Sequence, residues 1–243
     1  MLAIFVAMMQ EAQGLKSRMN INNSSLFPTF RVYEGTLSTN KVILIVTGMG
    51  EANAAKAAKY VLDKYPIDDI LSTGLCGGLN EKSKMGDFII YNAIKNEEKE
   101  LVTLCPDCHL ILRARAKLAE LCLSCTLGTG LTVEKVCSSP TNKRELGVRF
   151  CADAVDMESY QLAEASIRNK IPFLTLRCVF DTVYEDLTDV NAVMGNNDSE
   201  RLKGLYYLLI HPSCVKKLMD YKKRTRILGE NLAEFVCGYV NEI

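Results

Sequence analysis

Two stretches decide the fold class of this 243-residue chain: AVDMESYQLAEA, residues 154–165, and PFLTLRCVFD, residues 172–181. Each contains a short apolar run that is typical of a buried strand, and each carries an acid at the end of that run. Glu158 opens an alanine-rich helix, and Asp181 ends the longer strand. In open α/β sheets, ligands bind outside the carboxyl ends of the strands. We therefore expect both acids to face one crevice.

A third acid, Glu11, follows another apolar run of strand length, LAIFVAMMQ (residues 2–10). Three carboxylates around one pocket suit the cleavage of a glycosidic bond. One can protonate the leaving group, one can activate water and one can hold a sugar diol. An acid after a strand is often only a helix cap. Two such acids in the contexts DMES and RCVFD favour the functional interpretation.

The composition indicates a globular α/β protein, because 48% of the residues are apolar and the 29 basic and 29 acidic residues balance. That balance gives no sign of nucleic-acid binding. No apolar run approaches ~20 residues, so no transmembrane helix is expected. The apolar N-terminus lacks a basic start and a cleavage site, so we expect a buried first strand and a cytoplasmic protein. The ten cysteines are then expected to be reduced and mostly buried.

Strand-like runs alternate with helical patterns, which is typical of βαβ units and of a parallel or mixed sheet between helical layers. The runs at 29–37 and 41–47 are joined by a short polar turn and should pair antiparallel. No repeat or linker divides the chain, so one domain over residues 1–243 is expected. We expect strands at 2–8, 29–37, 41–47, 68–73, 87–94, 123–128, 151–156 and 172–180, and helices at 51–65, 109–121, 157–169, 200–210 and 213–240.

Two glycine-rich stretches end predicted strands. TGMGEANAA (47–55) leads into a helix whose free amides could accept an anion, or it is only a tight packing turn; both interpretations stay open. A dinucleotide fingerprint needs an acid at the end of the next strand, whereas Asp68 and Asp69 lie at its start. The second stretch contains Gly74 and Gly77, and such glycines let backbone approach a ligand closely.

Other catalytic patterns are weak. The cysteine pairs 105/108 and 122/125 flank a predicted helix that rises roughly 18 Å, so they cannot share one tetrahedral ion, and no metal is expected. Haem attachment to the first pair would need an exported protein. The two histidines, His109 and His211, lie beside no candidate nucleophile, which argues against a hydrolytic triad.

The ordered motifs VAMMQEAQGL, TGMGEANAA, TGLCGGL with MGD, and AVDMES followed by PFLTLRCVFD carry a resemblance over nearly the whole chain. The sequence resembles the purine nucleoside phosphorylase and methylthioadenosine/adenosylhomocysteine nucleosidase superfamily. Within it, the segments LTVEKVCSSPTNKRELG and LLIHPSCVKKLMDYKK look like those of the hopanoid-associated phosphorylases. The resemblance implies a three-layer αβα fold with a central twisted mixed sheet, and a homodimer or higher oligomer.

The resemblance also implies roles for the acids. Glu158 would hold the ribose hydroxyls, Asp181 would protonate or hydrogen-bond N7 of the leaving purine, and Glu11 would activate water. For Asp181 to be an acid at neutral pH, burial must raise its pKa, and its apolar neighbours in the sequence could do so. The remaining implied contacts to substrate are Met157, Gly74, Leu75, Gly77 and Phe180.

The chain departs from the family pattern at several positions. Phe180 stands where a serine usually precedes the acid, which puts contacts to the base edge in question. Ser72 and Leu75 replace the arginine and serine that phosphorylases often carry, and the early Gly-Asp-Pro-x-Arg pattern is absent. A phosphate dianion would thus find few partners. Hydrolysis is therefore favoured, with no cofactor, and phosphorolysis with phosphate as co-substrate is the alternative.

The leading hypothesis is an enzyme that releases adenine from a 5′-substituted adenosine, and the hopanoid resemblance points to adenosylhopane. A lipid substrate would give the basic cluster at 222–226 a membrane surface to rest on, whereas the simpler interpretation of this segment is a helix docked on the sheet. The alternatives are a salvage enzyme for small purine nucleosides such as methylthioadenosine, and a nucleoside-binding protein without turnover. All three acids are present, which argues against the last.

Overall fold

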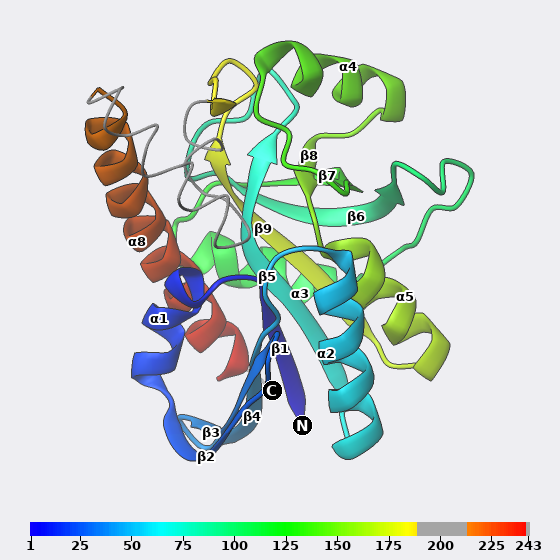
Figure 1. Ribbon diagram of the computed structural model, residues 1–243. Coiled ribbons are helices and arrows are strands. Elements are labelled where there is room, and N and C mark those ends of the chain that lie inside the picture. Colours follow the sequence, from blue (N-terminus) through cyan, green and yellow to red (C-terminus); the bar gives the residue numbers. More distant parts are fainter. Residues whose placement is uncertain (189–212, 242–243) are drawn as a thin grey trace.

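The computed structural model describes residues 1–188 and 213–241, and the side chains of all of these except 213–216. Within these residues, nine strands form one mixed sheet with helices on both faces (Figure 1). The predicted fold class is confirmed. The elements, in chain order, are β1 (Leu2–Val6), α1 (Met9–Arg18), β2 (Asn20–Leu26), β3 (Arg31–Leu37), β4 (Asn40–Val46), α2 (Glu51–Lys64), β5 (Asp69–Gly78), β6 (Phe88–Asn96), α3 (Cys108–Glu120), β7 (Cys125–Thr132), α4 (Pro140–Phe150), β8 (Ala154–Asp156), α5 (Ser159–Asn169), β9 (Phe173–Asp181) and α8 (Ser213–Val240).

The sheet is mixed: β2, β3 and β4 pair antiparallel at one edge, β5–β8 and β6–β9 are also antiparallel, and the remaining pairs are parallel. The strand order is β2-β3-β4-β1-β5-β8-β7-β6-β9, and β9 also pairs in parallel with β5. This extra pairing closes β5, β8, β7, β6 and β9 into a ring. The long strand β5 makes closure possible, because its first half pairs with β1 and its last two residues pair with β8.

Two hydrophobic cores lie on opposite faces of the sheet. Along β1, Leu2, Ile4 and Val6 face one core, and Ala3 and Phe5 face the other, as the alternation of side chains in a strand requires. The first core is covered by α1, α3 and α8 and the second by α2 and α5 (Figure 1). This arrangement is the αβα sandwich that the motifs predict.

Three elements are absent from the sequence-based prediction. Helix α1 was hidden in an apolar run that resembles a strand, and β2 has a polar sequence, NINNSSL, that stays on the edge of the sheet. Helix α4 follows a proline-containing segment, but Ser139 caps it by accepting a hydrogen bond from the Asn142 backbone N–H, and Pro140 occupies its first turn. The helix expected at 200–210 lies outside the described residues.

The expectation that the cysteines are mostly buried is wrong for the described part of the chain. Of the nine cysteines whose side chains are described, three are buried and four are exposed (Cys105, Cys108, Cys122 and Cys151). The reason is geometric: α3 buries a stripe through Leu110, Ala114 and Leu118, while Cys108 and Cys122 lie beyond this stripe at its two ends. Among the described residues no cluster of His, Cys, Asp and Glu could hold a metal ion.

Candidate active site

Glu158 caps α5 at the end of β8, where its side chain turns toward the start of α2. The backbone N–H of Gly50, which caps α2, donates to Glu158 Oε1 at 2.7 Å. This amide is one of the free donors that a helix N-terminus leaves unpaired. The free amide that TGMGEANAA (47–55) offers to an anion is therefore bound by a carboxylate of the protein itself, that of Glu158. Burial, followed by the nearby Asp156, raises the pKa of Glu158 to about 7.

Glu11 lies in the first turn of α1, one turn after β1 ends. Its Oε2 accepts a long hydrogen bond of 3.4 Å from the Met8 backbone N–H, which is a capping-box contact. The side chain is buried, with 4% of its surface exposed. Burial raises its pKa to about 7, and repulsion from Glu158 acts in the same direction. Glu158 is thus close enough to influence the ionisation of Glu11.

Arg177 lies in the middle of β9 and is the buried cation between these acids. Its Nε donates to Asp156 Oδ2 at 3.0 Å, and its Nη2 donates to Ser72 Oγ at 2.9 Å and Ser159 Oγ at 2.8 Å. Its Nη1 is buried and has no hydrogen-bond partner among the described residues. A buried, unpaired guanidinium nitrogen is costly. We interpret Nη1 as a donor directed toward a ligand or water atom.

Gly74 of β5 is where Glu11 and Arg177 approach the same backbone. A Cβ at this position would lie 3.0 Å from Glu11 Oε2 and 3.7 Å from Arg177 Nη1. The φ angle of Gly74 is also +152°, which side chains of L residues rarely adopt. Glycine therefore keeps the space between the carboxylate and the guanidinium open.

Asp181 ends β9 beside Gly77, three residues further along β5. A Cβ on Gly77 would lie 3.5 Å from Asp181 Oδ2. Burial raises the pKa of Asp181 to about 6, and the ammonium of Lys143, 2.5 Å from Oδ2, acts in the opposite direction. Apolar neighbours in the sequence were expected to keep this acid neutral. Burial does raise its pKa, but a lysine that the sequence reasoning missed limits the rise.

The other predicted substrate contacts lie around these acids. Met157 is half-buried against the cluster that contains Leu79 and Val155, and Leu75 is half-buried against the α1/α8 core. Phe180 packs on Tyr221 of α8, with ring centroids 5.6 Å apart. The strand register shifts here, because Cys76 pairs with Val179 and Gly77 pairs with Asp181. Phe180 is therefore the extra residue of a β-bulge.

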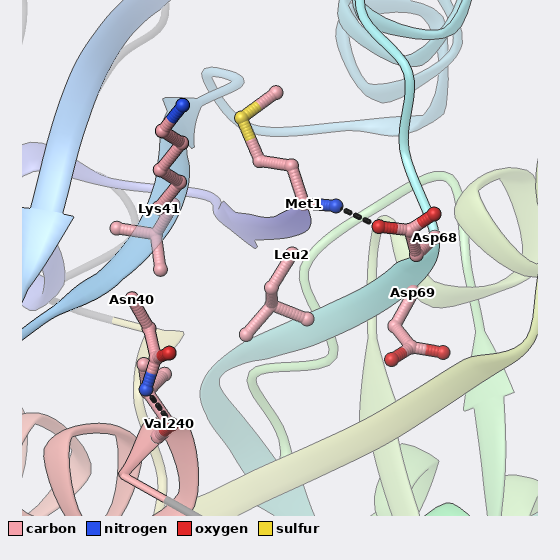
Figure 2. A pocket seen from close by; sticks show the side chains of 8 residues that line it. Met1, Leu2, Asn40, Lys41, Asp68, Asp69 and Val240 are labelled. Atoms are coloured by element: carbon pink, nitrogen blue, oxygen red, sulfur yellow. Dashed lines mark hydrogen bonds and ion pairs between the residues drawn. The ribbon is translucent and has the colours of Figure 1, made fainter. Parts of the chain in front are cut away.

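Of two hollows formed by the described residues, one reaches a predicted acid. A cavity of about 10 Å³ lies beside Glu11 and Thr73, under Leu232 and Val236 of α8. A larger hollow of about 220 Å³ lies at the amino-terminal ends of β1, β4 and β5 (Figure 2). There Asn40 Nδ2 donates to the Val240 carbonyl, and the Met1 amino group pairs with Asp68. None of the predicted site residues lines this second hollow.

Sequence reasoning missed Arg177 and Lys143, and it weighed a helix cap as the alternative role of Asp156. Asp156 accepts hydrogen bonds from Thr132 Oγ1 and from the backbone N–H groups of Glu158 and Ser159, so it fixes the start of α5. Arg177 had a signal, since a charged residue inside the buried run LTLRCVF needs partners. Lys143 had none, because its place on α4 is distant in sequence from Asp181.

Comparison with known proteins agrees with this geometry. Residues 1–205 match a family model described as the Phosphorylase superfamily. The chain is 24% identical over 199 residues to a 5′-methylthioadenosine/S-adenosylhomocysteine nucleosidase of Exiguobacterium sp., an alignment that covers 75% of this chain and 85% of the relative.

Two solved structures share the fold. The nucleosidase of the same name from Neisseria meningitidis, in complex with methylthio-immucillin-A, has a TM-score of 0.78 at 21% identity, with 100% of this chain and 99% of that chain covered. The futalosine hydrolase of Helicobacter pylori has a TM-score of 0.77 at 14% identity, with coverage of 100% and 97%. The family match spans most of the sequence, and the motifs in the sequence pointed to the same group: the chain belongs to the Phosphorylase superfamily.

Proposed function

We propose that this protein is an enzyme that cleaves the N-glycosidic bond of a 5′-substituted purine nucleoside, with water as the nucleophile. The observation that carries the proposal is the distribution of charge along β5. Glu11 and Arg177 approach Gly74, with Glu158 near enough to raise the pKa of Glu11, and Asp181 lies near Gly77 beside Lys143. These two glycines are about 10 Å apart along a strand that rises about 3.3 Å per residue. A ribose and its purine can bridge that span.

The first group of charges suits the sugar side of the reaction. The pKa values of Glu11 and Glu158 are both raised to about 7, so the pair holds roughly one proton near neutral pH. The N–H of Gly50 stabilises the ionised form of Glu158, as a carboxylate that holds ribose hydroxyls requires. Glu11 is then the general base that takes a proton from water, and the unpaired Nη1 of Arg177 can orient that water.

Asp181 suits the leaving base. A purine is a poor leaving group as an anion, and a proton at N7 lowers the barrier; such proton transfer contributes about 10²–10⁴-fold in rate. Burial raises the pKa of Asp181 to about 6, which leaves a protonated fraction near neutral pH. Met157, Leu75 and Phe180 are proposed to contact the sugar, the 5′ group or the base from the surrounding elements.

Water is favoured over phosphate because the cation near the sugar side is already neutralised. Arg177 pairs with Asp156, and its guanidinium also lies within electrostatic range of Glu11 and Glu158. A phosphate dianion at this place would meet two carboxylates at close range. The enzyme needs no cofactor for this chemistry.

Two kinds of 5′ substituent are candidates for the substrate. The resemblance of residues 131–147 and 208–223 to hopanoid-associated phosphorylases supports adenosylhopane. The names of the curated relatives support methylthioadenosine and S-adenosylhomocysteine instead. Homo-oligomer formation and contact of α8 with a membrane surface are further proposals that follow from the same family resemblance.

The test is a base-release assay on purified protein. Adenosylhopane, methylthioadenosine, S-adenosylhomocysteine and adenosine are supplied with and without phosphate, and free adenine and the sugar product are quantified. Free ribose-type sugar without phosphate is the expected product. A strict requirement for phosphate, with a sugar 1-phosphate as product, would overturn hydrolysis, and absence of base release from every nucleoside would leave only a binding protein.

A further inference from the structure

Lys143 is a fully buried lysine directly behind the proposed acid. Its residue exposure is 0%, and its Nζ lies 2.5 Å from Asp181 Oδ2. Helix α4 carries Lys143 across the end of the ring of strands, so that its side chain reaches the last residue of β9. The Asp181 carboxylate is itself 4% exposed, so neither charge is compensated by bulk water.

The lysine ammonium is surrounded by three oxygen atoms. Its Nζ forms an ion pair with Asp181 Oδ2 and donates hydrogen bonds to the backbone carbonyls of Thr182 at 2.9 Å and Glu185 at 2.7 Å. Both carbonyls belong to the segment that directly follows β9, so the lysine fixes Asp181 and its own backbone at once. Burying an ion pair costs several kcal/mol of desolvation, and an apolar pair of similar volume is often at least as stable. A buried lysine here thus needs a reason other than stability.

We propose that Lys143 is a positioning residue for Asp181, an inference that rests on the proposed function. Lys143 fixes the carboxyl group on the side of the leaving base and stabilises the negative charge that Asp181 gains during the reaction. When the C1′–N9 bond breaks, its electron pair moves into the purine. The proton of Asp181 passes to N7, and the carboxylate left behind lies beside the ammonium. Lys143 gives up no proton in this step.

The surroundings of Asp181 make Lys143 the dominant opposing charge. The titratable or charged groups that face Asp181 are Lys143 from α4, Glu185 from the following segment, Arg224 and Tyr221 from α8, Cys76 from β5, and Cys137. Arg224 is engaged elsewhere, since its Nη1 donates to Glu185 Oε2 at 2.7 Å and to the Phe180 carbonyl at 3.0 Å. Burial makes Asp181 a weaker acid, and Lys143 counters this effect at contact distance.

The experiment compares Lys143→Met, Lys143→Gln and Lys143→Arg with the wild type. The ionisation of Asp181 is followed by carbon NMR of protein labelled at the aspartate carboxyl carbons, with Asp181→Asn to assign the resonance, and the pH profile of kcat/KM is measured in parallel. Lys143→Gln keeps a donor for the backbone carbonyls, which covers the case in which Lys143→Met does not fold. Lys117→Met is the matched control, because Lys117 is a buried lysine (7% exposed) that pairs with Glu120 on α3.

Loss of the positive charge should raise the midpoint of the Asp181 titration by about 1–3 pH units and move one limb of the activity profile by the same amount. Lys143→Arg should stay near the wild type, and Lys117→Met should lower the melting temperature without moving either midpoint. An unchanged Asp181 midpoint in Lys143→Met or Lys143→Gln would overturn the inference. If the midpoint moves but the wild type cleaves no nucleoside, the proposed function fails, and the catalytic role of Lys143 fails with it, while the pairing stands.

Discussion

Arg177 connects three elements of the fold through hydrogen bonds to three different side chains. It reaches Asp156, Ser72 and Ser159 at 2.8–3.0 Å, and these partners come from β8, β5 and α5. Removing one member of a buried ion pair leaves an uncompensated charge, which commonly costs 3–5 kcal/mol. Substitutions at Arg177 would therefore mix loss of folding with loss of activity. Asp181 is a better residue for testing the chemistry.

Asp181→Asn should lower kcat by about 10²–10⁴-fold and leave ligand affinity nearly unchanged. The amide keeps the size of the side chain and can still donate a hydrogen bond, but it cannot transfer a proton to N7. Turnover is measured by adenine release, and affinity is measured by calorimetry with a non-cleavable nucleoside analogue. Asp63→Asn on the exposed face of α2 serves as the control. Equal rates for Asp181→Asn and wild type would contradict the assignment of Asp181 as the acid.

The sequence was informative about the residues of the candidate site only where one segment contains the whole signal. Glu158 and Asp181 stand next to the strand ends that carry them, so pattern and motif identify them together. The partner of Arg177 on β5, Ser72, lies 105 residues away, and Lys143 reaches Asp181 only because α4 folds across the ring. Such long-range pairs depend on tertiary packing, which local periodicity does not encode.

At the scale of elements, the packing of β6 against β7 requires a glycine at position 130. A Cβ on Gly130 of β7 would lie 2.0 Å from the ring of Tyr91 on β6, and that ring is fully buried. The two strands pair in parallel across this point, so the ring occupies the space of the missing side chain. Because β6 and β7 are both part of the closed ring of strands, this contact lies within the ring.

Gly130→Ala should lower the free energy of unfolding by about 1–3 kcal/mol, as overpacking of a filled core commonly does. Denaturant unfolding followed by circular dichroism gives the value. Thr126→Ala, on an exposed position of the same strand, should change stability by less than about 0.5 kcal/mol. Adding Tyr91→Leu to Gly130→Ala should recover part of the loss. No recovery in the double variant would mean that the Tyr91 ring is not the obstacle.

Element boundaries could be predicted where the apolar pattern is regular, as in β4, β9 and α2. Helix α1 could not, because its first turn continues the apolar run of β1 and its amphipathic stripe covers only Ala12, Gly14 and Leu15. Strand β2 could not either, since hydrogen bonds to β3 rather than apolar side chains fix it at the sheet edge. Tertiary pairing overrides weak local preference in both cases.

At the scale of the whole molecule, three buried acids make folding sensitive to pH. In the folded state the pKa values of Glu11 and Glu158 are raised from 4.5 to about 7, and that of Asp181 from 3.8 to about 6. A raised folded-state pKa means that the folded protein binds the proton more tightly than the unfolded chain does. The stability that this binding contributes is complete below pH 4 and is lost as the pH rises to about 7.

Glu158→Gln should therefore flatten the pH dependence of stability. We expect the variant to gain up to about 3 kcal/mol over the wild type at pH 8, relative to their difference at pH 4. Melting temperatures measured in steps from pH 4 to pH 8 test this expectation. Glu98→Gln, a substitution of an exposed acid, is the control. Parallel curves for Glu158→Gln and wild type would show that Glu158 ionises in the same way in both states.

The surface of α8 allows a separate test of membrane contact. Lys222, Lys223 and Arg226 are exposed, while Leu228, Leu232 and Phe235 are buried in the α1/α8 core, so the helix docks on the sheet and presents its basic cluster outward. No helix in the described ranges is long and apolar enough to span a bilayer. If the membrane proposal is correct, the protein should float with anionic vesicles at low salt, and a Lys222→Glu/Lys223→Glu variant should not. Equal flotation of both, or of neither, would discard the proposal.

The bulge at Phe180 has a consequence for substrate selection. Phe180 has no partner residue on β5, so a substitution there leaves the strand register unchanged and Asp181 in its place. On the proposed role of Phe180 as a substrate contact, a saturation library at this one position is expected to change which nucleosides are accepted while Asp181 keeps its place.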